Sequence, residues 1–197
     1  MKKVLMIFVL VAWTVSALAQ NTFRETGTVT IQPKFGVAVG YLAGNWTSTA
    51  DNKLRAGVAL GVEAEYYAAP WIGIAAGVNY AMQGWKWSLQ DSNDKIQKYN
   101  YINIPAVCNF YVVKGLALKT GVQVGFLLNA HYDDVDIKDA SNTVSFAIPV
   151  GLSYESGNII LDARYNFAVT HVNKNATSVD KWRSDLIQLT IGYKFEL

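Results

Sequence analysis

The feature that most constrains this fold is a two-residue alternation that recurs in eight stretches of the chain. In each stretch, apolar residues occupy every second position, and small or polar residues occupy the positions between them. Successive side chains of a β-strand point to opposite faces, so this period predicts strands with two unlike faces. The predicted strands are residues 35–41, 55–66, 72–83, 101–110, 116–126, 144–155, 159–167 and 186–195.

The two faces of these strands differ in a way that indicates a membrane. The apolar face carries no charged residue, and Thr120 is its one polar residue. The other face is rich in Gly and Ala, whereas the water-exposed face of a soluble sandwich is normally rich in Lys, Glu and Thr. Small residues suit a narrow, crowded interior. We therefore expect the apolar face to meet lipid and the small or polar face to line a lumen.

The connections between the predicted strands alternate strictly between short and long. Short connections lie at residues 67–71, 113–115 and 156–158, and long ones at 43–53, 87–98, 127–143 and 168–184. Tight periplasmic turns and long outer loops are typical of outer-membrane barrels. Strand backbone groups in hydrocarbon must be paired within the protein, so the last strand should pair with the first. The sequence predicts an all-β fold, an eight-stranded antiparallel up-and-down transmembrane β-barrel.

The first residues resemble a secretory signal. Lys2 and Lys3 precede an apolar run over residues 4–13, and Ala17-Leu18-Ala19 fits a cleavage site of the A-x-A type. We therefore expect a signal peptide over 1–19, a periplasmic segment over 20–33 and an outer-membrane barrel domain over 34–197. The predicted location is the cell outer membrane.

Composition excludes several classes of function. The chain has 17 Lys and Arg residues and 15 Asp and Glu residues, and only 16% of it is charged. Loss of residues 1–19 would remove two Lys and leave a neutral chain, so no bulk basic field for nucleic acid is expected. A single Cys excludes an internal disulfide and a Cys-rich zinc module. We expect no cofactor and no metal site.

Most of the charges on the predicted lumen face lie in its periplasmic half. Four are basic and four are acidic: Lys34, Glu63, Glu65, Lys119, Glu155, Asp162, Arg164 and Lys194. Buried charges are tolerated when they are paired. The prediction is an interior network of ion pairs that plugs the lumen. The alternatives are a gated path for protons or ions, and a paired-carboxylate site.

Other reactive residues fall in predicted outer loops without a catalytic spacing. His131 and His171 are the only histidines, and the first lies near a group of aspartates at 133, 134, 136 and 139. No nucleophile–base–acid arrangement stands out, so no catalytic residues are expected. Four tryptophans, Trp46, Trp85, Trp87 and Trp182, gather toward the outer side and suit either interface anchoring or a surface for a partner or glycan.

Two short motifs resemble a known family. The run Tyr101-Ile102-Asn103-Ile104-Pro105 is similar to the aromatic-x-x-Ile-Pro strand of PorT-like outer-membrane β-barrel proteins of Bacteroidota. Residues 187–195, Ile-Gln-Leu-Thr-Ile-Gly-Tyr-Lys-Phe, resemble that family's closing strand. The resemblance spans residues 34–195 and implies a porin-like outer-membrane barrel. It also raises an accessory role in protein secretion.

These observations together predict a non-enzymatic outer-membrane barrel with a structural or surface-binding role. The expected partners are outer-membrane lipid, the barrel assembly machinery and an unidentified surface ligand or secretion partner. Three alternatives stay open: a narrow channel, a secretion-accessory barrel and an outer-membrane lipid hydrolase.

Overall fold

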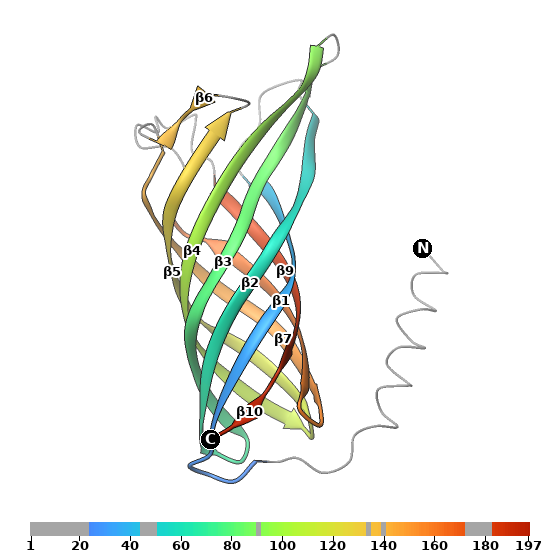
Figure 1. Cartoon of the computed structure of the whole chain (residues 1–197), viewed down its shortest axis with the longest axis vertical. Helices are drawn as coiled ribbons and strands as arrows, with labels where there is room; N and C mark the ends of the chain where they lie inside the picture. Colours follow the sequence, from blue (N-terminus) through green and yellow to red (C-terminus); the bar gives the residue numbers. More distant parts are fainter. Residues whose placement is uncertain (1–23, 44–50, 90–91, 133–134, 139–140, 172–182) are drawn as a thin grey trace, which may run out of the picture.

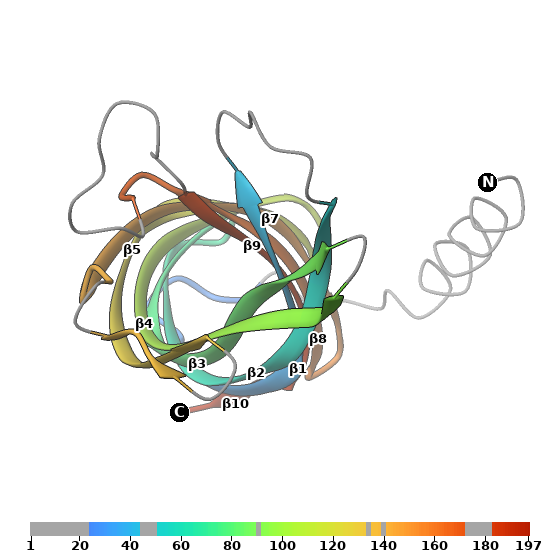
Figure 2. The ribbon, with the colours of Figure 1, turned by 90° about the horizontal axis from the view of Figure 1, so that it is seen from above.

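Eight antiparallel strands form the wall of a closed barrel, as the sequence predicts (Figures 1 and 2). The computed structural model describes residues 24–43, 51–89, 92–132, 135–138, 141–171 and 183–197. The wall strands are β1 (Val29–Ala43), β2 (Asp51–Ala69), β3 (Ile72–Leu89), β4 (Ser92–Val113), β5 (Leu116–Tyr132), β7 (Val144–Ser156), β8 (Ile159–Ala168) and β9 (Arg183–Tyr193). The short β6 (Val135–Asp136) pairs with the end of β5.

Closure runs through β1 and β9, which pair from Lys34 opposite Gly192 to Ala43 opposite Arg183. The short β10 (Phe195–Glu196) continues the line of β9 and pairs with Ile31 and Thr30 of β1. The first and last strands therefore close the ring. In a closed ring the backbone N–H and C=O groups of these two strands are paired within the protein, as a hydrocarbon environment requires.

The three strand prolines lie where the ladder is interrupted. Pairing of β3 with β4 is missing around Pro105, and pairing of β5 with β7 is missing around Pro149. Pro33 was expected to precede the first strand, but β1 begins at Val29 and Pro33 lies inside it, opposite the break between β9 and β10. Proline has no N–H to donate, so each one is tolerated at a gap in one of its two ladders.

The predicted faces are confirmed along the wall. Outward apolar side chains are exposed, with Phe35 at 62% and Val122 at 63%, while the intervening side chains are buried. Two of the three short turns contain a glycine at positive φ, Gly115 (78°) and Gly157 (60°), a backbone conformation that other residues adopt at a cost. The exposed outward side chains show that the alternation in the sequence predicts correctly which side of each strand faces out.

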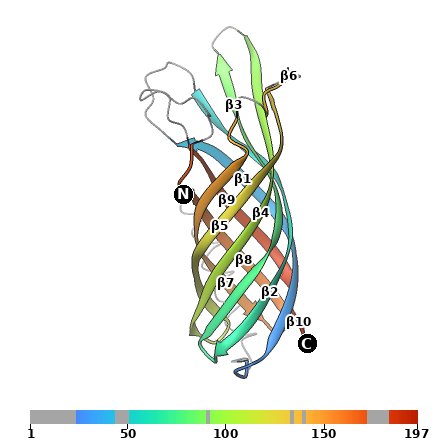
Figure 3. The same cartoon turned by 90° about the vertical axis from the view of Figure 1, so that its left-hand side faces the viewer.

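The outer ends of the strands differ from prediction. Residues 87–98 were expected to form a long loop, but β3 and β4 continue as a paired hairpin up to Leu89 opposite Ser92. Likewise β2 begins at Asp51 and β5 runs to Tyr132. The sheet of β2–β5 consequently rises above the rest of the wall, and we call this part the outer extension (Figures 1 and 3). Above the bilayer one face need not be apolar, so the alternation that marks membrane strands fades there.

In the part of the chain that the structure describes, no helix is long and apolar enough to cross a bilayer.

The orientation of the wall can be tested with two valines of equal exposure. Val122 lies in the middle of β5, and Val135 lies in β6 beside the outer end; each side chain is 63% exposed. Arginine at the bilayer midplane costs roughly 2–4 kcal/mol, and the cost falls to about 0–1 kcal/mol near the interface. We expect Val122→Arg to lower the free energy of unfolding in lipid vesicles by about 2–4 kcal/mol, and Val135→Arg to lower it by at most about 1 kcal/mol. Equal losses for the two variants, measured by urea titration, would contradict the orientation.

Candidate functional site

The lumen of the periplasmic half is filled by charged side chains that reach one another because the adjoining residues are small. A Cβ added at Gly73 would overlap the Glu65 carboxylate, and one added at Gly61 would overlap the Asn79 side-chain oxygen. Glycine at these two positions therefore leaves the room in which the carboxylate and the amide lie. Two groups of contacts result.

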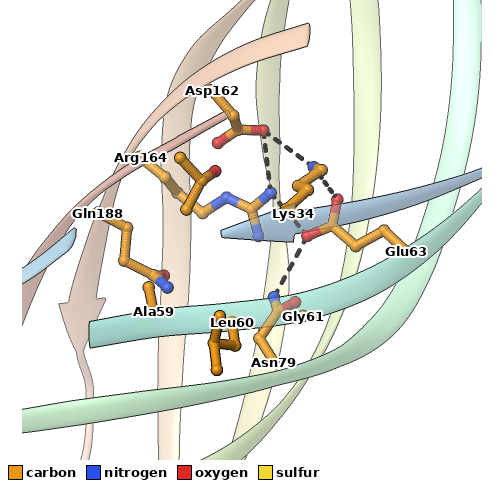
Figure 4. A pocket seen from close by; sticks show the side chains of 10 residues that line it. Lys34, Ala59, Leu60, Gly61, Glu63, Asn79, Asp162, Arg164 and Gln188 are labelled. Carbon is orange, nitrogen blue, oxygen red and sulfur yellow. Dashed lines mark hydrogen bonds and ion pairs between the residues drawn. The ribbon is translucent and has the colours of Figure 1, made fainter. Parts of the chain in front are cut away.

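The first group, the middle cluster, consists of Lys34, Glu63, Lys119, Asp162 and Arg164 (Figure 4 shows four of the five). Lys34 Nζ donates to Glu63 Oε2 at 2.6 Å and to Asp162 Oδ2 at 3.2 Å. Arg164 Nη2 donates to Glu63 Oε1 at 2.9 Å and to Asp162 Oδ2 at 3.2 Å. Lys119 Nζ contacts Asp162 Oδ2 directly and lies 3.6 Å from Glu63 Oε2. Both carboxylates are thus shared among three cations.

The middle cluster links opposite walls of the barrel. Its residues come from β1, β2, β5 and β8. In the order of the wall strands, β5 lies halfway around the ring from β1, so Lys119 and Lys34 approach Asp162 from opposite walls. All five side chains are buried. The contacts therefore extend across the lumen rather than along one wall.

The second group, the periplasmic cluster, consists of Glu65, Tyr67, Tyr111, Glu155 and Lys194. Lys194 Nζ donates to Glu65 Oε2 at 2.6 Å, to the Tyr67 hydroxyl at 2.8 Å and to the Tyr111 hydroxyl at 3.0 Å, and it contacts Glu155 Oε1. The Tyr111 hydroxyl lies 2.8 Å from Glu65 Oε1 and 2.7 Å from Glu155 Oε1. A hydroxyl has one hydrogen, so it donates to one carboxylate at a time while Lys194 holds both.

Arg24 closes the periplasmic mouth beneath this cluster. Its side chain is buried, its Nη1 donates to Glu196 Oε2 at 2.5 Å, and its Nε lies 4.0 Å from Glu155 Oε2. The turn that carries it is held by a hydrogen bond from Gly27 N to the Tyr67 carbonyl at 2.8 Å. The segment before β1 is thereby bonded to the strand that carries Glu65.

The outer half of the lumen is lined mainly by amides instead of ion pairs. The buried amide side chains there are Asn79, Gln83, Asn103, Gln123, Asn166 and Gln188. Asp185 accepts hydrogen bonds from the Tyr165 hydroxyl at 2.6 Å and from Ala168 N at 2.9 Å. Charge density therefore falls from the periplasmic end of the lumen toward its outer end.

The structure places all eight of the predicted lumen charges inside the barrel and joins them in the two clusters. Sequence reasoning missed three members of the network: Arg24, Tyr67 and Tyr111. Tyr67 continues the inward series of Glu63 and Glu65, so the alternation itself could have found it. No pattern marks Arg24, because it lies outside the strands.

The other candidate residues do not form a site in the described chain. His131 lies at the outer end of β5, where it is the register partner of Lys98 and Asp136, and the His171 carbonyl accepts a hydrogen bond from Asn142 Nδ2 at 2.7 Å. Among the described residues no group of His, Cys, Asp and Glu is arranged to hold a metal ion. Trp46, Trp182, Asp133, Asp134 and Asp139 lie outside the described residues. The structure gives no side-chain description for Trp85, Trp87 or Asp136.

Comparison with known proteins agrees with this architecture. The model of the family described as outer membrane protein beta-barrel domain matches residues 18–174. Neisserial surface protein A is similar in structure, with a TM-score of 0.52 and 18% identity over 85% of this chain and 97% of that one. Ail of Yersinia pestis, in its complex with the heparin analogue sucrose octasulfate, gives a TM-score of 0.50 and 16% identity over 86% of this chain and 99% of that one. No curated protein matches the chain by sequence.

The chain belongs to the family of outer membrane protein beta-barrel domains, because the family match covers most of its length. At these identities the two solved structures support the fold and nothing finer.

The middle cluster should contribute strongly to stability. Glu63→Gln would leave Lys34 and Arg164 short of a buried counter-charge, and breaking a buried pair in this way costs about 3–5 kcal/mol. We expect a loss of that size in the free energy of unfolding, measured by urea titration in lipid vesicles. Glu25→Gln is the matched control, because Glu25 is exposed in the turn before β1 and its replacement should cost less than about 0.5 kcal/mol. Similar values for the two variants would show that the network does not hold the barrel together.

Proposed function

We propose that this chain is a non-enzymatic outer-membrane barrel whose lumen is plugged, and that its role is structural or surface-binding. The observation that carries the proposal is the middle cluster, in which cations from opposite walls share two buried carboxylates. An ion crossing the lumen would have to separate these pairs while they are out of water. That separation is expensive, because the freed charges stay buried.

The outer extension supports the surface-binding part of the proposal. The sheet of β2–β5 continues past the outer ends of β8 and β9, with pairing between β3 and β4 up to Leu89. A paired sheet holds its shape better than a loop does, so it offers a fixed surface outside the membrane. The unidentified ligand or secretion partner would bind there, and a secretion-accessory role of the PorT-like kind is the finer form of this proposal.

The remaining parts of the proposal concern the envelope. Residues 1–19 direct export, the mature chain begins on the periplasmic side with the residues before β1, which starts at Val29 and not after residue 33, and the barrel contacts outer-membrane lipid through its apolar wall. Residues 187–195 serve as the closing strand that the barrel assembly machinery would recognise. No nucleic-acid partner is proposed, since the mature chain is neutral.

Conductance separates a plugged barrel from a narrow channel. The purified barrel in planar lipid bilayers should show no steady single-channel conductance, because the middle cluster blocks the lumen. Arg164→Ala removes one cation of the cluster and serves as the comparison. Steady conductance in the unmodified protein that changes in size with Arg164→Ala or Glu63→Gln would favour the channel.

The hydrolase alternative has a separate test. Lipid A from cells with and without the protein should have the same composition if the barrel is not an enzyme. A difference that disappears when His131 or His171 is replaced would overturn the non-enzymatic proposal.

Export predicts a defined mature end. N-terminal sequencing of the protein purified from outer-membrane fractions should begin at Gln20, because Ala17-Leu18-Ala19 precedes the expected cleavage point. A chain that begins at Met1 in those fractions would contradict the signal peptide. Protease treatment of intact cells should cut the predicted long outer loops and spare the barrel wall.

A further inference from the structure

A groove crosses the outward face of the barrel wall over four neighbouring strands, β7, β8, β9 and β1. Its volume is about 510 Å³, and sites for small ligands usually measure about 300–1,000 Å³. The outward side chains along it are mostly large and apolar, and they include Phe35, Leu152, Leu161, Leu189 and Ile191. The groove therefore lies on the side of the wall that faces away from the charged lumen.

The groove is deep because its floor is an alanine. Ala163 of β8 is the register partner of Leu152 on β7 and of Leu189 on β9, so a single methyl group lies between two larger side chains. The lining also includes Ser153 and Asp162, whose side chains are buried on the lumen side. At this place the groove consequently reaches the backbone of the sheet, and an apolar chain can lie closer to the barrel here than on the leucines beside it.

The groove follows a row of register partners that climbs the wall. Along this row the partners are, in order, Leu116, Tyr154, Leu161, Ile191 and Phe35. The row starts at the first residue of β5, beside a short turn, and ends well inside β1, because the strands are tilted (Figure 1). Its four steps between strands amount to about 19 Å, and one leaflet is roughly half of a hydrocarbon core about 30 Å thick. The groove therefore has the length and slant of an acyl chain in the periplasmic leaflet.

A cation lies at the end of the groove where the headgroup of such a lipid would be. Lys114 is exposed in the β4–β5 turn, two residues before Leu116, and a hydrogen bond from Glu155 N to the Gly115 carbonyl at 2.7 Å holds this turn against β7. Among the described residues of the periplasmic end, Lys114 is the one exposed cation, because the others are buried. Tyr154, beside Leu116 in the sheet, has an aromatic ring with a polar tip, which favours the headgroup level.

We propose that this groove binds one phospholipid of the periplasmic leaflet, with an acyl chain along the row from Leu116 to Phe35 and the phosphate next to Lys114. The apolar lining suits the chain, and an ammonium group with three N–H donors suits the phosphate. The proposal deepens the expected contact with outer-membrane lipid, and it rests on the apolar wall facing acyl chains. It assigns one lipid a defined place on the wall and a defined chemical class.

Native mass spectrometry of the folded barrel, released from detergent micelles, counts bound lipids. The probe is palmitoyl-oleoyl phosphatidylglycerol, and a diacylglycerol with the same two chains is the control that lacks the phosphate. We expect one phosphatidylglycerol to stay bound at a lipid concentration at which the diacylglycerol does not. Adducts without a preferred number, or equal binding of the two probes, would overturn the site. A dimer of the barrel that excludes the lipid would show that a second copy occupies the groove, and would also overturn it.

The acyl-chain part of the site has a matched pair of variants. Ala163→Leu fills the floor of the groove and should weaken phosphatidylglycerol binding by about tenfold, because methylene groups of the chain lose their contact with the wall. Ala76→Leu is the control, since Ala76 is an exposed alanine of β3, halfway around the ring from β8. It should leave binding unchanged. Equal affinities of the two variants would contradict the groove.

The phosphate part has a second pair. Lys114→Gln should weaken phosphatidylglycerol binding by about two- to fivefold, which is the size of effect that exposed ion pairs give. Lys98→Gln removes an exposed cation from the outer end of β4 and should leave binding unchanged. If both variants bind as the unmodified protein does, the phosphate does not lie next to Lys114 and the proposal fails.

Photo-cross-linking maps the lipid on the unmodified protein in lipid vesicles. With a diazirine at the end of one acyl chain of phosphatidylglycerol, cross-links should concentrate near Val37 and Leu189, at the upper end of the groove. Cross-links spread evenly around the wall would overturn the groove and leave the proposed function standing. An absence of cross-links to the wall, together with equal losses for Val122→Arg and Val135→Arg, would overturn both, because the wall would not face lipid.

Discussion

The pairing of every backbone N–H and C=O in hydrocarbon is the constraint on which the rest of this structure depends. It requires β1 to meet β9, and it makes each strand pair with both of its neighbours. It also explains where proline is allowed. Pro33, Pro105 and Pro149 all lie beside gaps in the ladder, so none of them removes a bond that the sheet otherwise makes. The closed ring is narrow because its wall has only eight strands, and side chains fill a lumen of that size.

The narrow ring determines what the lumen face can contain. Side chains from opposite walls meet, so large residues on every strand would collide, and glycine at positions such as Gly61 and Gly73 leaves the space that their neighbours use. Charges in this space must find partners on other strands, because water is scarce there. The result is a set of shared ion pairs in place of separate salt bridges.

The sequence predicts the wall well because lipid imposes one rule on every strand. A residue such as Val62 or Leu189 must be apolar wherever it meets acyl chains, so the period is visible without an alignment. The rule stops at the edge of the bilayer, which is why residues 87–98 look like a loop and fold as a hairpin. The alternation and the position of each residue along its strand are enough to predict that the eight charges point inward and where along the lumen they lie. Their division into two clusters could not be predicted, since it depends on which strands face each other across the ring. Arg24 shows a further limit: it reaches the lumen from a turn, where no period applies.

The contacts across the lumen also stabilise the shape of the barrel cross-section, which the hydrogen bonds between neighbouring strands do not. Ladder hydrogen bonds link each strand to its neighbours only, so they set the circumference of the ring and leave its cross-section free to flatten. The middle cluster joins β1 and β2 to β5 and β8, and the periplasmic cluster joins β2 and β4 to β7 and to Lys194, which lies between β9 and β10. Links of this kind resist flattening, because pressing one pair of walls together spreads the other pair and separates buried charges. A mechanical role of this kind accounts for the eight buried charges, and it places the part of the barrel that is linked across the lumen below the outer extension.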